Sequence, residues 1–293
     1  MPYSWLTLVG LALLGSGIGY ISGLFGVGGG FLLTPLLNAL FGIDWATATA
    51  SGLAQMIFVG GGAAWRHARA GYVDLRLAAY MAPGIIAGSF AGSALLDWLK
   101  RLGNVRLLAA NVPIINLVLN SIFTVMLIAI AFRLWCDVGQ QQDDDIDGEL
   151  NWVNGPWPLS MPTSNIIASA LSLLGSGVLI GVMGGLLGIG GGVILIPLLL
   201  YGYGILLRIA VGTSSLIILV SALVGTAVKY GHVNLYLVAV LVTGALLGVP
   251  LGTRHSHRLP VCGLQRSFAL LVVSAAGFIV FRLVSPFIPW VMH

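Results

Sequence analysis

Charged side chains are scarce in this chain of 293 residues, where Asp, Glu, Lys and Arg together make up only 8%. Soluble domains carry about 25% charged residues. Hydrophobic residues supply 58% of the chain, and the mean hydropathy is +1.01. The composition therefore excludes an ordinary soluble protein and indicates membrane-spanning helices, each of which needs about 20 apolar residues.

Cysteines and the motifs of soluble enzymes are also scarce or missing. The two cysteines, Cys136 and Cys262, are expected to be free thiols and make no metal site by themselves. The sequence holds no phosphate-binding loop that ends in Gly-Lys-Ser or Gly-Lys-Thr, no zinc-protease helix and no nucleophile elbow. We therefore expect no enzyme, no cofactor and no built-in ATP hydrolysis.

Acidic residues are few and unevenly placed. Five of the nine lie within residues 143–149, and the others, Asp44, Asp74, Asp97 and Asp137, fall at expected helix ends or in loops. A cation site at membrane depth normally needs carboxylates. The placement of the acidic residues argues against a cation pump, and the 13 Lys and Arg residues favour a path for an anion. The basic excess also fits membrane orientation and anionic lipid headgroups.

What the chain does contain is a glycine motif that occurs twice. Residues 26–31 read Gly-Val-Gly-Gly-Gly-Phe and residues 188–193 read Gly-Ile-Gly-Gly-Gly-Val, and a proline follows each at Pro35 and Pro197. The two copies are 162 residues apart. Internal repeats that carry interrupted apolar segments are typical of transporters with a binding site near the membrane midplane.

The whole chain can be divided around this repeat. We predict a first transmembrane repeat at 1–135, an acidic, proline-containing linker at 136–163 and a second repeat at 164–293. Each repeat opens with a glycine-broken helix and continues with three spans, which gives an all-α polytopic protein of about eight transmembrane helices. The predicted helices are 6–25 with 31–41, 46–65, 77–99, 105–135, 166–187 with 193–207, 209–229, 233–253 and 267–284. Residues 1–5 lack the basic start of a signal peptide, so the first helix is expected to be retained.

The third predicted span of each repeat carries glycine at every fourth position. These glycines are Gly84, Gly88 and Gly92 in one repeat and Gly244, Gly248 and Gly252 in the other. A spacing of four places them on one helix face. Close packing of helices is the favoured interpretation, with substrate contact as the alternative.

The distribution of Lys and Arg bears on membrane topology. If each glycine-broken segment crosses once, the repeats are parallel, and six basic residues lie on one side against seven on the other. If each segment turns back at its glycines, the repeats are inverted and the division is eight against five. The positive-inside rule then favours inverted repeats with the linker in the cytoplasm. Parallel repeats remain the alternative.

The glycine runs are candidate substrate-binding sites. Residues 31–41 would form a helix of about 16 Å, which is half a bilayer, so the preceding glycines are expected at membrane depth. Glycine allows a turn there, and the exposed N–H groups and the N-termini of the half-helices favour an anion. The alternative is that the glycines only pack helices tightly. The candidates are Gly28, Gly29, Gly30, Gly190, Gly191 and Gly192.

Polar side chains on the following spans add candidates. Thr47, Ser51 and Gln55 lie on one helical face, and Thr213 and Ser214 occupy the matching stretch of the second repeat. Their hydroxyl and amide groups can donate to sulfonate or carboxylate oxygens, and they can equally well bond helices together.

Metal and histidine signals are weak. Asp143, Asp145 and Asp147 match the start of a calcium-binding loop, but its twelfth position is Asn154 and not Glu, so a solvated acidic loop is favoured. We interpret His255 and His257 as surface charge and not as metal ligands. His67 and His232 are expected at the membrane interface.

Residues 23–35, 185–197 and 210–216 resemble the TauE/SafE sulfite-exporter family of membrane permeases. The resemblance covers about 5–135 and 164–285. It implies transport of small sulfur-containing anions without ATP, at the six glycines above with Thr213 and Ser214 nearby. The first repeat departs from the pattern, because Ser51-Gly52 stands where the second has Thr213-Ser214. The acidic linker is not expected of the family.

Together these features predict a multi-pass permease of the inner (plasma) membrane that moves a sulfur oxyanion or organosulfonate, such as sulfite or sulfoacetate, by alternating access. The alternatives are a membrane scaffold or sensor that acts through its acidic linker, and a passive anion channel. The expected partners are a small anion and the lipid bilayer, with no nucleic acid. A homodimer is one assembly that the sequence allows.

Overall fold

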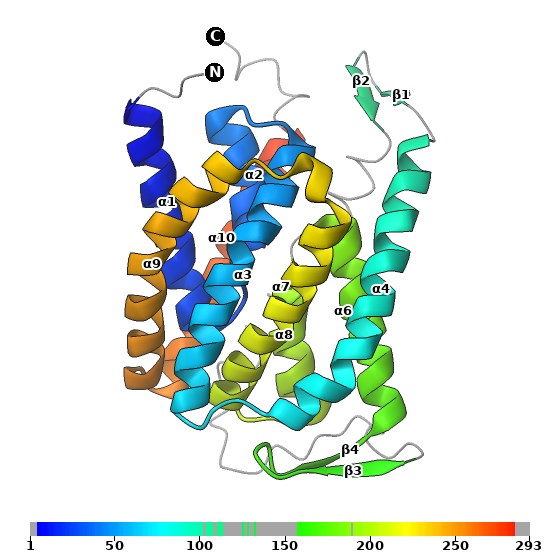
Figure 1. Ribbon diagram of the computed structural model, residues 1–293, viewed down its shortest axis with the longest axis vertical. Coiled ribbons are helices and arrows are strands. Elements are labelled where there is room, and N and C mark those ends of the chain that lie inside the picture. The colour runs from blue at the N-terminus through cyan, green and yellow to red at the C-terminus, as the bar shows by residue number, and fades with distance from the viewer. Residues whose placement is uncertain are drawn as a thin grey trace. The chain divides into compact units, whose positions relative to one another are not determined.

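The computed structural model describes residues 5–101, 104–107, 110–113, 125, 128, 132, 157–188 and 190–284 (Figure 1). The chain divides into two compact units. The first unit comprises Met1–Ser93 and Ile146–Leu259, and the second comprises Ala94–Asp145 and Pro260–His293. All predicted substrate-binding residues belong to the first unit. This division rests on contacts between residues and does not follow the predicted repeat boundaries. Those boundaries stay a prediction.

Helices make up most of the described chain, and their order follows the internal repeat. The first half contains α1 (Trp5–Phe25), α2 (Gly30–Phe41), α3 (Trp45–Arg69) and α4 (Leu75–Arg101), which continues into the second unit. The second half contains α6 (Ala170–Leu187), α7 (Gly192–Pro197) with the π-turn η1 (Leu198–Gly202), α8 (Leu207–Val228), the 3₁₀ turn η2 (Tyr230–His232), α9 (Leu235–Arg258) and α10 (Val261–Val284).

Two short antiparallel hairpins accompany the helices. Strand β1 (Asn104–Leu107) pairs with β2 (Ala110–Pro113), with Asn104 opposite Pro113. Strand β3 (Pro158–Met161) pairs with β4 (Ile166–Ser169), with Pro158 opposite Ser169. Asn165 has a φ of 52° at the turn before β4, a conformation that Asn tolerates better than most residues.

These hairpins correct two sequence predictions and bear on a third. The helix predicted at 105–135 cannot begin at 105, because strands occupy 104–107 and 110–113. The helix predicted from 166 begins at Ala170, because 166–169 forms β4. The linker predicted at 136–163 includes a strand near its C-terminal end, because Pro158–Met161 forms β3. Short apolar runs fit a strand as well as the end of a helix, which explains these errors.

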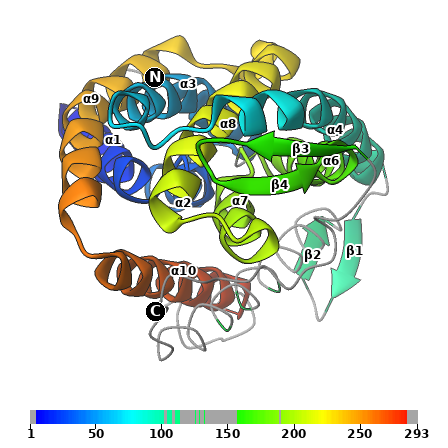
Figure 2. The same cartoon turned by 90° about the horizontal axis from the view of Figure 1, so that it is seen from below.

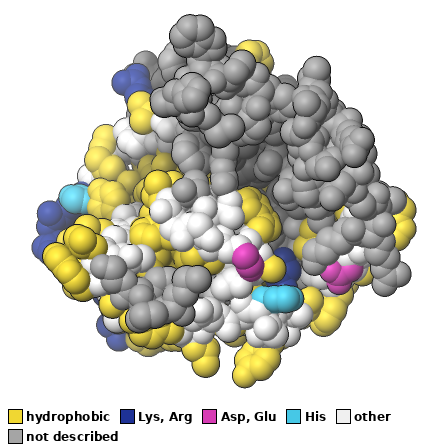
Figure 3. Space-filling model, turned by 90° about the horizontal axis from the view of Figure 1, so that it is seen from above, with side chains coloured by type: hydrophobic (Ala, Val, Ile, Leu, Met, Phe, Trp, Pro, Cys, Tyr) yellow, Lys and Arg dark blue, Asp and Glu magenta, His cyan; other side chains and the backbone are white. Residues whose placement is uncertain are grey.

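Four of the described helices are long and apolar enough to cross a membrane: Trp5–Phe25, Leu75–Leu99, Leu207–Val228 and Leu235–Arg258. Large hydrophobic side chains such as Leu13, Phe90 and Leu247 lie exposed on these helices. Seen from above, hydrophobic side chains lie along much of the visible edge of the described part of the chain, with a few Lys, Arg and His side chains among them (Figure 3). The outside is therefore suited to lipid. A total of eight membrane helices stays a prediction, because most of the span predicted at 105–135 lies outside the described residues.

The glycine stripes pack helices of the two halves together. A Cβ atom at Gly84, Gly88 or Gly92 of α4 would clash with carbonyl oxygens of α6. A Cβ atom at Gly244, Gly248 or Gly252 of α9 would clash with carbonyl oxygens of α1. Figure 2 shows α9 beside α1 and α4 beside α6. The packing interpretation of these glycines is confirmed. Helix α4 of the first half lies on α6 of the second half, and α9 of the second half lies on α1 of the first.

Candidate functional site

Both glycine motifs form turns between two helices. Gly26, Gly28 and Gly29 have φ values of 66°, 77° and 68°, and the equivalent Gly188, Gly190 and Gly191 have 68°, 67° and 72°. Residues with a side chain rarely adopt such φ values. The chain then re-enters a helix at Gly30 in α2 and at Gly192 in α7. The predicted break in each first helix is therefore confirmed.

The two glycine turns touch each other inside the first unit. A Cβ atom at Gly192 would clash with the carbonyl oxygen of Val27 in the other turn. Gly28 lies against Ile218, and Gly190 lies against both Met56 and Ile218. Met56 and Ile218 are themselves equivalent, since they are 162 residues apart, and both are buried. We call this meeting of the two turns with Met56 and Ile218 the central contact.

The central contact is packed and apolar. Gly29 lies against Ile18 and Gly191 against Ile180, which again are equivalent positions. The structure thus brings the predicted glycines of both halves together but surrounds them with hydrocarbon. Met56 and Ile218 fill the space beside Gly28 and Gly190 in this conformation.

Two of the predicted polar residues hold helix starts. The Thr213 hydroxyl accepts a hydrogen bond from the Asp74 backbone N–H at 3.0 Å. The Ser51 hydroxyl accepts one from the Asn234 backbone N–H, also at 3.0 Å. The side chains of Asp74 and Asn234 accept from the first turns of α4 and α9. In this conformation Ser51 of α3 therefore fixes the start of α9, and Thr213 of α8 fixes the start of α4.

Ser214 fixes the first glycine turn. Its Oγ lies 2.7 Å from the Gly26 carbonyl oxygen and 2.9 Å from that of Val211. The second glycine turn has no such hydroxyl, because Gly52 occupies the position equivalent to Ser214. The two turns therefore differ in how α8 and α3 support them.

Gln55 remains the predicted polar side chain with unused hydrogen-bonding capacity. It is 1% exposed, and its Nε2 has no partner among the described residues. The buried Thr34 hydroxyl on α2 also lacks one within that part of the chain. Thr34 lies next to Gly52, which is less than one turn from Gln55 on α3. Buried polar atoms normally have a hydrogen-bond partner, so the Gln55 amide and the Thr34 hydroxyl are suited to contact a ligand.

A basic side chain holds the end of each first helix. The His67 Nε2–H donates to the Gly23 carbonyl at 3.3 Å, and the Lys229 ammonium donates to the Gly185 carbonyl, also at 3.3 Å. Donors and acceptors are both related by 162 residues. The last carbonyls of a helix favour a cationic or N–H partner.

His67 is buried inside the protein, and its predicted place at the membrane interface stays a prediction. His67 is 1% exposed because the end of α9 covers it, and its Nδ1 lies 3.1 Å from Nε2 of His257. The repeat itself carried a signal that sequence reasoning missed, since His67 aligns with Lys229 when the two glycine motifs are superimposed.

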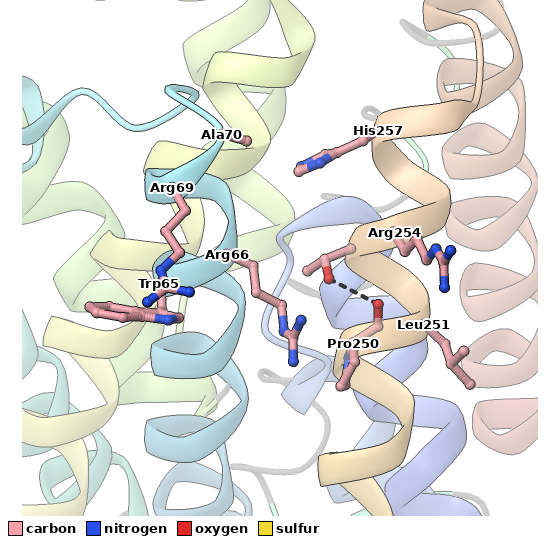
Figure 4. A pocket seen from close by; sticks show the side chains of 9 residues that line it. Trp65, Arg66, Arg69, Ala70, Pro250, Leu251, Arg254 and His257 are labelled. Carbon is pink, nitrogen blue, oxygen red and sulfur yellow. Dashed lines mark hydrogen bonds between the residues drawn. The ribbon is translucent and has the colours of Figure 1, made fainter.

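A basic cavity lies beside this histidine pair, between the ends of α3 and α9. Its volume is about 580 Å³, and its lining includes Arg66, Arg69, Arg254 and His257. Figure 4 shows Arg66 directed from α3 toward α9, and His257 directed from α9 into the same space. The Arg69 guanidinium lies over the Trp65 ring, 4.5 Å from its centroid. The interpretation of His257 as plain surface charge is therefore incomplete.

Metal sites receive no support from the described residues, which contain no group of three His, Cys, Asp or Glu side chains able to share an ion. The calcium candidates Asp143, Asp145 and Asp147 lie outside the described residues, as do Cys136 and the Cys262 side chain.

Comparison with known proteins identifies the family. The family model described as Sulfite exporter TauE/SafE matches residues 11–279. The chain belongs to the TauE/SafE family. The TauE/SafE name describes transporters and no enzyme activity. No solved structure matches the chain.

Bacterial relatives support the same conclusion. A probable membrane transporter protein of Haemophilus influenzae is 25% identical over 90% of this chain and 94% of its own length. YjnA of Bacillus subtilis, a probable membrane transporter protein, is 28% identical over 90% of this chain and 96% of its own length. The probable membrane transporter protein MamO of Magnetospirillum gryphiswaldense is 26% identical over 94% of this chain, which spans 45% of MamO. The protein is a multi-pass transporter-family protein of the plasma membrane.

Proposed function

We propose that the protein is a permease that moves a small anion, a sulfur oxyanion or organosulfonate such as sulfite or sulfoacetate, by alternating access without ATP hydrolysis. The observation that carries the proposal is the central contact, where two equivalent glycine turns meet inside the bundle of a transporter-family chain. Interrupted helices at equivalent positions of two repeats are the usual setting of a transporter's substrate site.

Inverted repeats are part of the proposal. In Figure 1, α1 and α3 run downward whereas their counterparts α6 and α8 run upward, and α4 and α9 are likewise opposed. Hydrogen bonds and chain connections group six of the seven Lys and Arg residues of the first unit at one end: Arg66, Arg69, Arg76, Arg208, Arg254 and Arg258. The positive-inside rule assigns this end to the cytoplasm.

The mechanism follows from the closed state of the central contact. Ile218 lies against Gly28 and Gly190, and Met56 also lies against Gly190, so hydrophobic side chains cover the meeting of the two turns as in an occluded state. A rearrangement that withdraws one of these side chains would expose backbone N–H groups. The N-termini of α2 and α7 begin at the same turns, and their partial positive charge favours an anion. Gln55 supplies a further N–H donor.

Flux into proteoliposomes tests the function. Purified protein is reconstituted and challenged with sulfite, sulfoacetate, taurine, sulfate, phosphate and chloride, with and without a proton gradient, against protein-free liposomes. We expect saturable flux of a sulfur oxyanion or organosulfonate, with competition between related substrates. Flux that does not saturate and shows no counterflow would indicate a passive channel. No flux of any anion under either gradient would refute the proposal.

A further inference from the structure

The basic cavity adjoins an apolar groove between α3 and α9. This second cavity, of about 80 Å³, is lined by Phe58, Gly62, Val242, Ala245 and Leu246 among others. Arg66 and Pro250 line both cavities, so the two are neighbours along α3 and α9. The groove therefore begins at a cluster of arginines and extends along α3 for about two helical turns toward the membrane interior.

The two ends of this feature differ in chemistry. The described lining of the basic end contains Arg66, Arg69 and Arg254 and no Asp or Glu. At the apolar end, Phe58 is 56% exposed and Leu246 is 64% exposed, so the groove opens on the outside of the helices. Trp65, also exposed, lies between the two ends in the sequence of α3. Tryptophan and arginine together are typical of the level of lipid headgroups.

We infer that this feature binds an anionic phospholipid. The phosphate headgroup lies in the basic cavity against Arg66 and Arg254, and one acyl chain lies in the groove along Gly62 and Val249. A basic pocket between membrane helices is suited to an acidic headgroup. A free oxyanion would use the arginines but gain nothing from an apolar groove that faces outward, so the position of the groove directly beside the basic cavity favours a lipid.

Binding of defined lipids to the detergent-solubilised full chain tests the inference by native mass spectrometry. The probes are phosphatidylglycerol, phosphatidylcholine with the same acyl chains, and glycerol 3-phosphate as a soluble headgroup. We expect phosphatidylglycerol to bind more tightly than either of the others. Each arginine near a lipid surface is expected to contribute about fivefold in affinity, so R66Q with R254Q should weaken phosphatidylglycerol binding about 25-fold.

Matched variants control for charge and for folding. R76Q with R258Q removes the same charge from the same end, but neither residue lines the cavity, so this pair should leave the tightest phosphatidylglycerol site intact. A Cβ atom at Gly62 would lie 3.6 Å from Val249, and one at Gly61 would lie 3.7 Å from Leu219, so both positions accept a side chain without a clash. G62L should fill the groove and weaken binding, whereas G61L should not.

Three results would overturn the inference. One is equal binding of phosphatidylglycerol and phosphatidylcholine. Another is an equal loss of binding in the two double arginine variants, which would indicate a general charge effect. The third is tight glycerol 3-phosphate binding that G62L leaves unchanged, which would indicate a site for a free oxyanion.

Discussion

The two halves of the molecule share their backbone contacts but differ in the side chains that make them. His67 and Lys229 hold equivalent carbonyl groups at the ends of α1 and α6. Lys229 is partly buried and donates through a primary amine, whereas His67 is buried and hydrogen-bonded to a second histidine. The two halves thus share the geometry of the glycine turns, while different side chains hold the ends of α1 and α6.

The same contrast appears beside the turns. Ser51 and Thr213 make equivalent hydrogen bonds to Asn234 and Asp74, so this pair is symmetric. Ser214 contacts the Gly26 carbonyl, whereas its counterpart Gly52 has no side chain to do so. The symmetric contacts therefore hold the starts of α4 and α9 in the same way, whereas the contact of Ser214 distinguishes the first glycine turn from the second.

The largest effect is expected where the two glycine turns touch. G192A would place a Cβ against the Val27 carbonyl oxygen, and the backbone cannot yield without separating the turns. We expect a loss of about 3 kcal/mol or more of stability and loss of anion flux. Thermal unfolding in detergent and flux assays measure both. G175A is the control, because no atom lies within 4 Å of a Cβ there; equal behaviour of the two variants would contradict the close contact.

Removing the side chain of His67 or of Lys229 is expected to have the next largest effect on stability. H67A loses hydrogen bonds to both Gly23 and His257, and K229A loses the one to Gly185. Loss of such a buried partner costs about 1–3 kcal/mol. We expect H67A to destabilise the protein more than H232A, a change at an exposed histidine. If H67A and H232A unfold at the same temperature, the role assigned to His67 is wrong.

Ser214 offers a smaller and sharper test of asymmetry. S214A removes the hydroxyl that reaches the Gly26 carbonyl and should cost about 1 kcal/mol. The adjacent S215A removes a hydrogen bond within α8 only and is expected to cost less. Chemical denaturation of both variants in detergent compares them. A greater loss from S215A would show that Ser214 does not support the turn.

The smallest effect is expected at the counterpart of Ser214. A Cβ atom at Gly52 would lie 3.4 Å from a Leu33 methyl group and 3.6 Å from the Thr34 hydroxyl, so G52A should fit with a small adjustment. Alanine favours a helix over glycine by about 1 kcal/mol. We expect a slight rise in thermal stability with flux preserved. A marked fall in stability would mean that α2 and α3 pack more tightly here than the structure indicates.

The sequence predicted the features that local pattern determines. The doubled glycine motif predicted both helix breaks, and glycine at every fourth residue predicted close packing, because turn conformation and helix periodicity depend on neighbouring residues. The sequence did not predict that Thr213 and Ser51 bond to helix starts of the other half. Nor did it predict the burial of His67 or the cavity at Arg66 and Arg254. The burial of His67, the cavity and the Ser51 contact depend on the pairing of α3 with α9, and the Thr213 contact depends on the position of α8 beside the start of α4. In each case the paired segments are far apart in the chain.

Thiol labelling at the central contact tests the account most directly. I218C and M56C are made separately in a chain whose Cys136 and Cys262 are replaced by serine, with A63C, at a buried position in the α3–α9 packing, as the control. The probe is the anionic sulfonatoethyl methanethiosulfonate, applied to proteoliposomes with and without sulfoacetate. We predict that the first two variants are labelled without sulfoacetate and that sulfoacetate slows this labelling, while A63C stays unlabelled in both conditions. Transport without labelling of either I218C or M56C would contradict an anion path between the glycine turns.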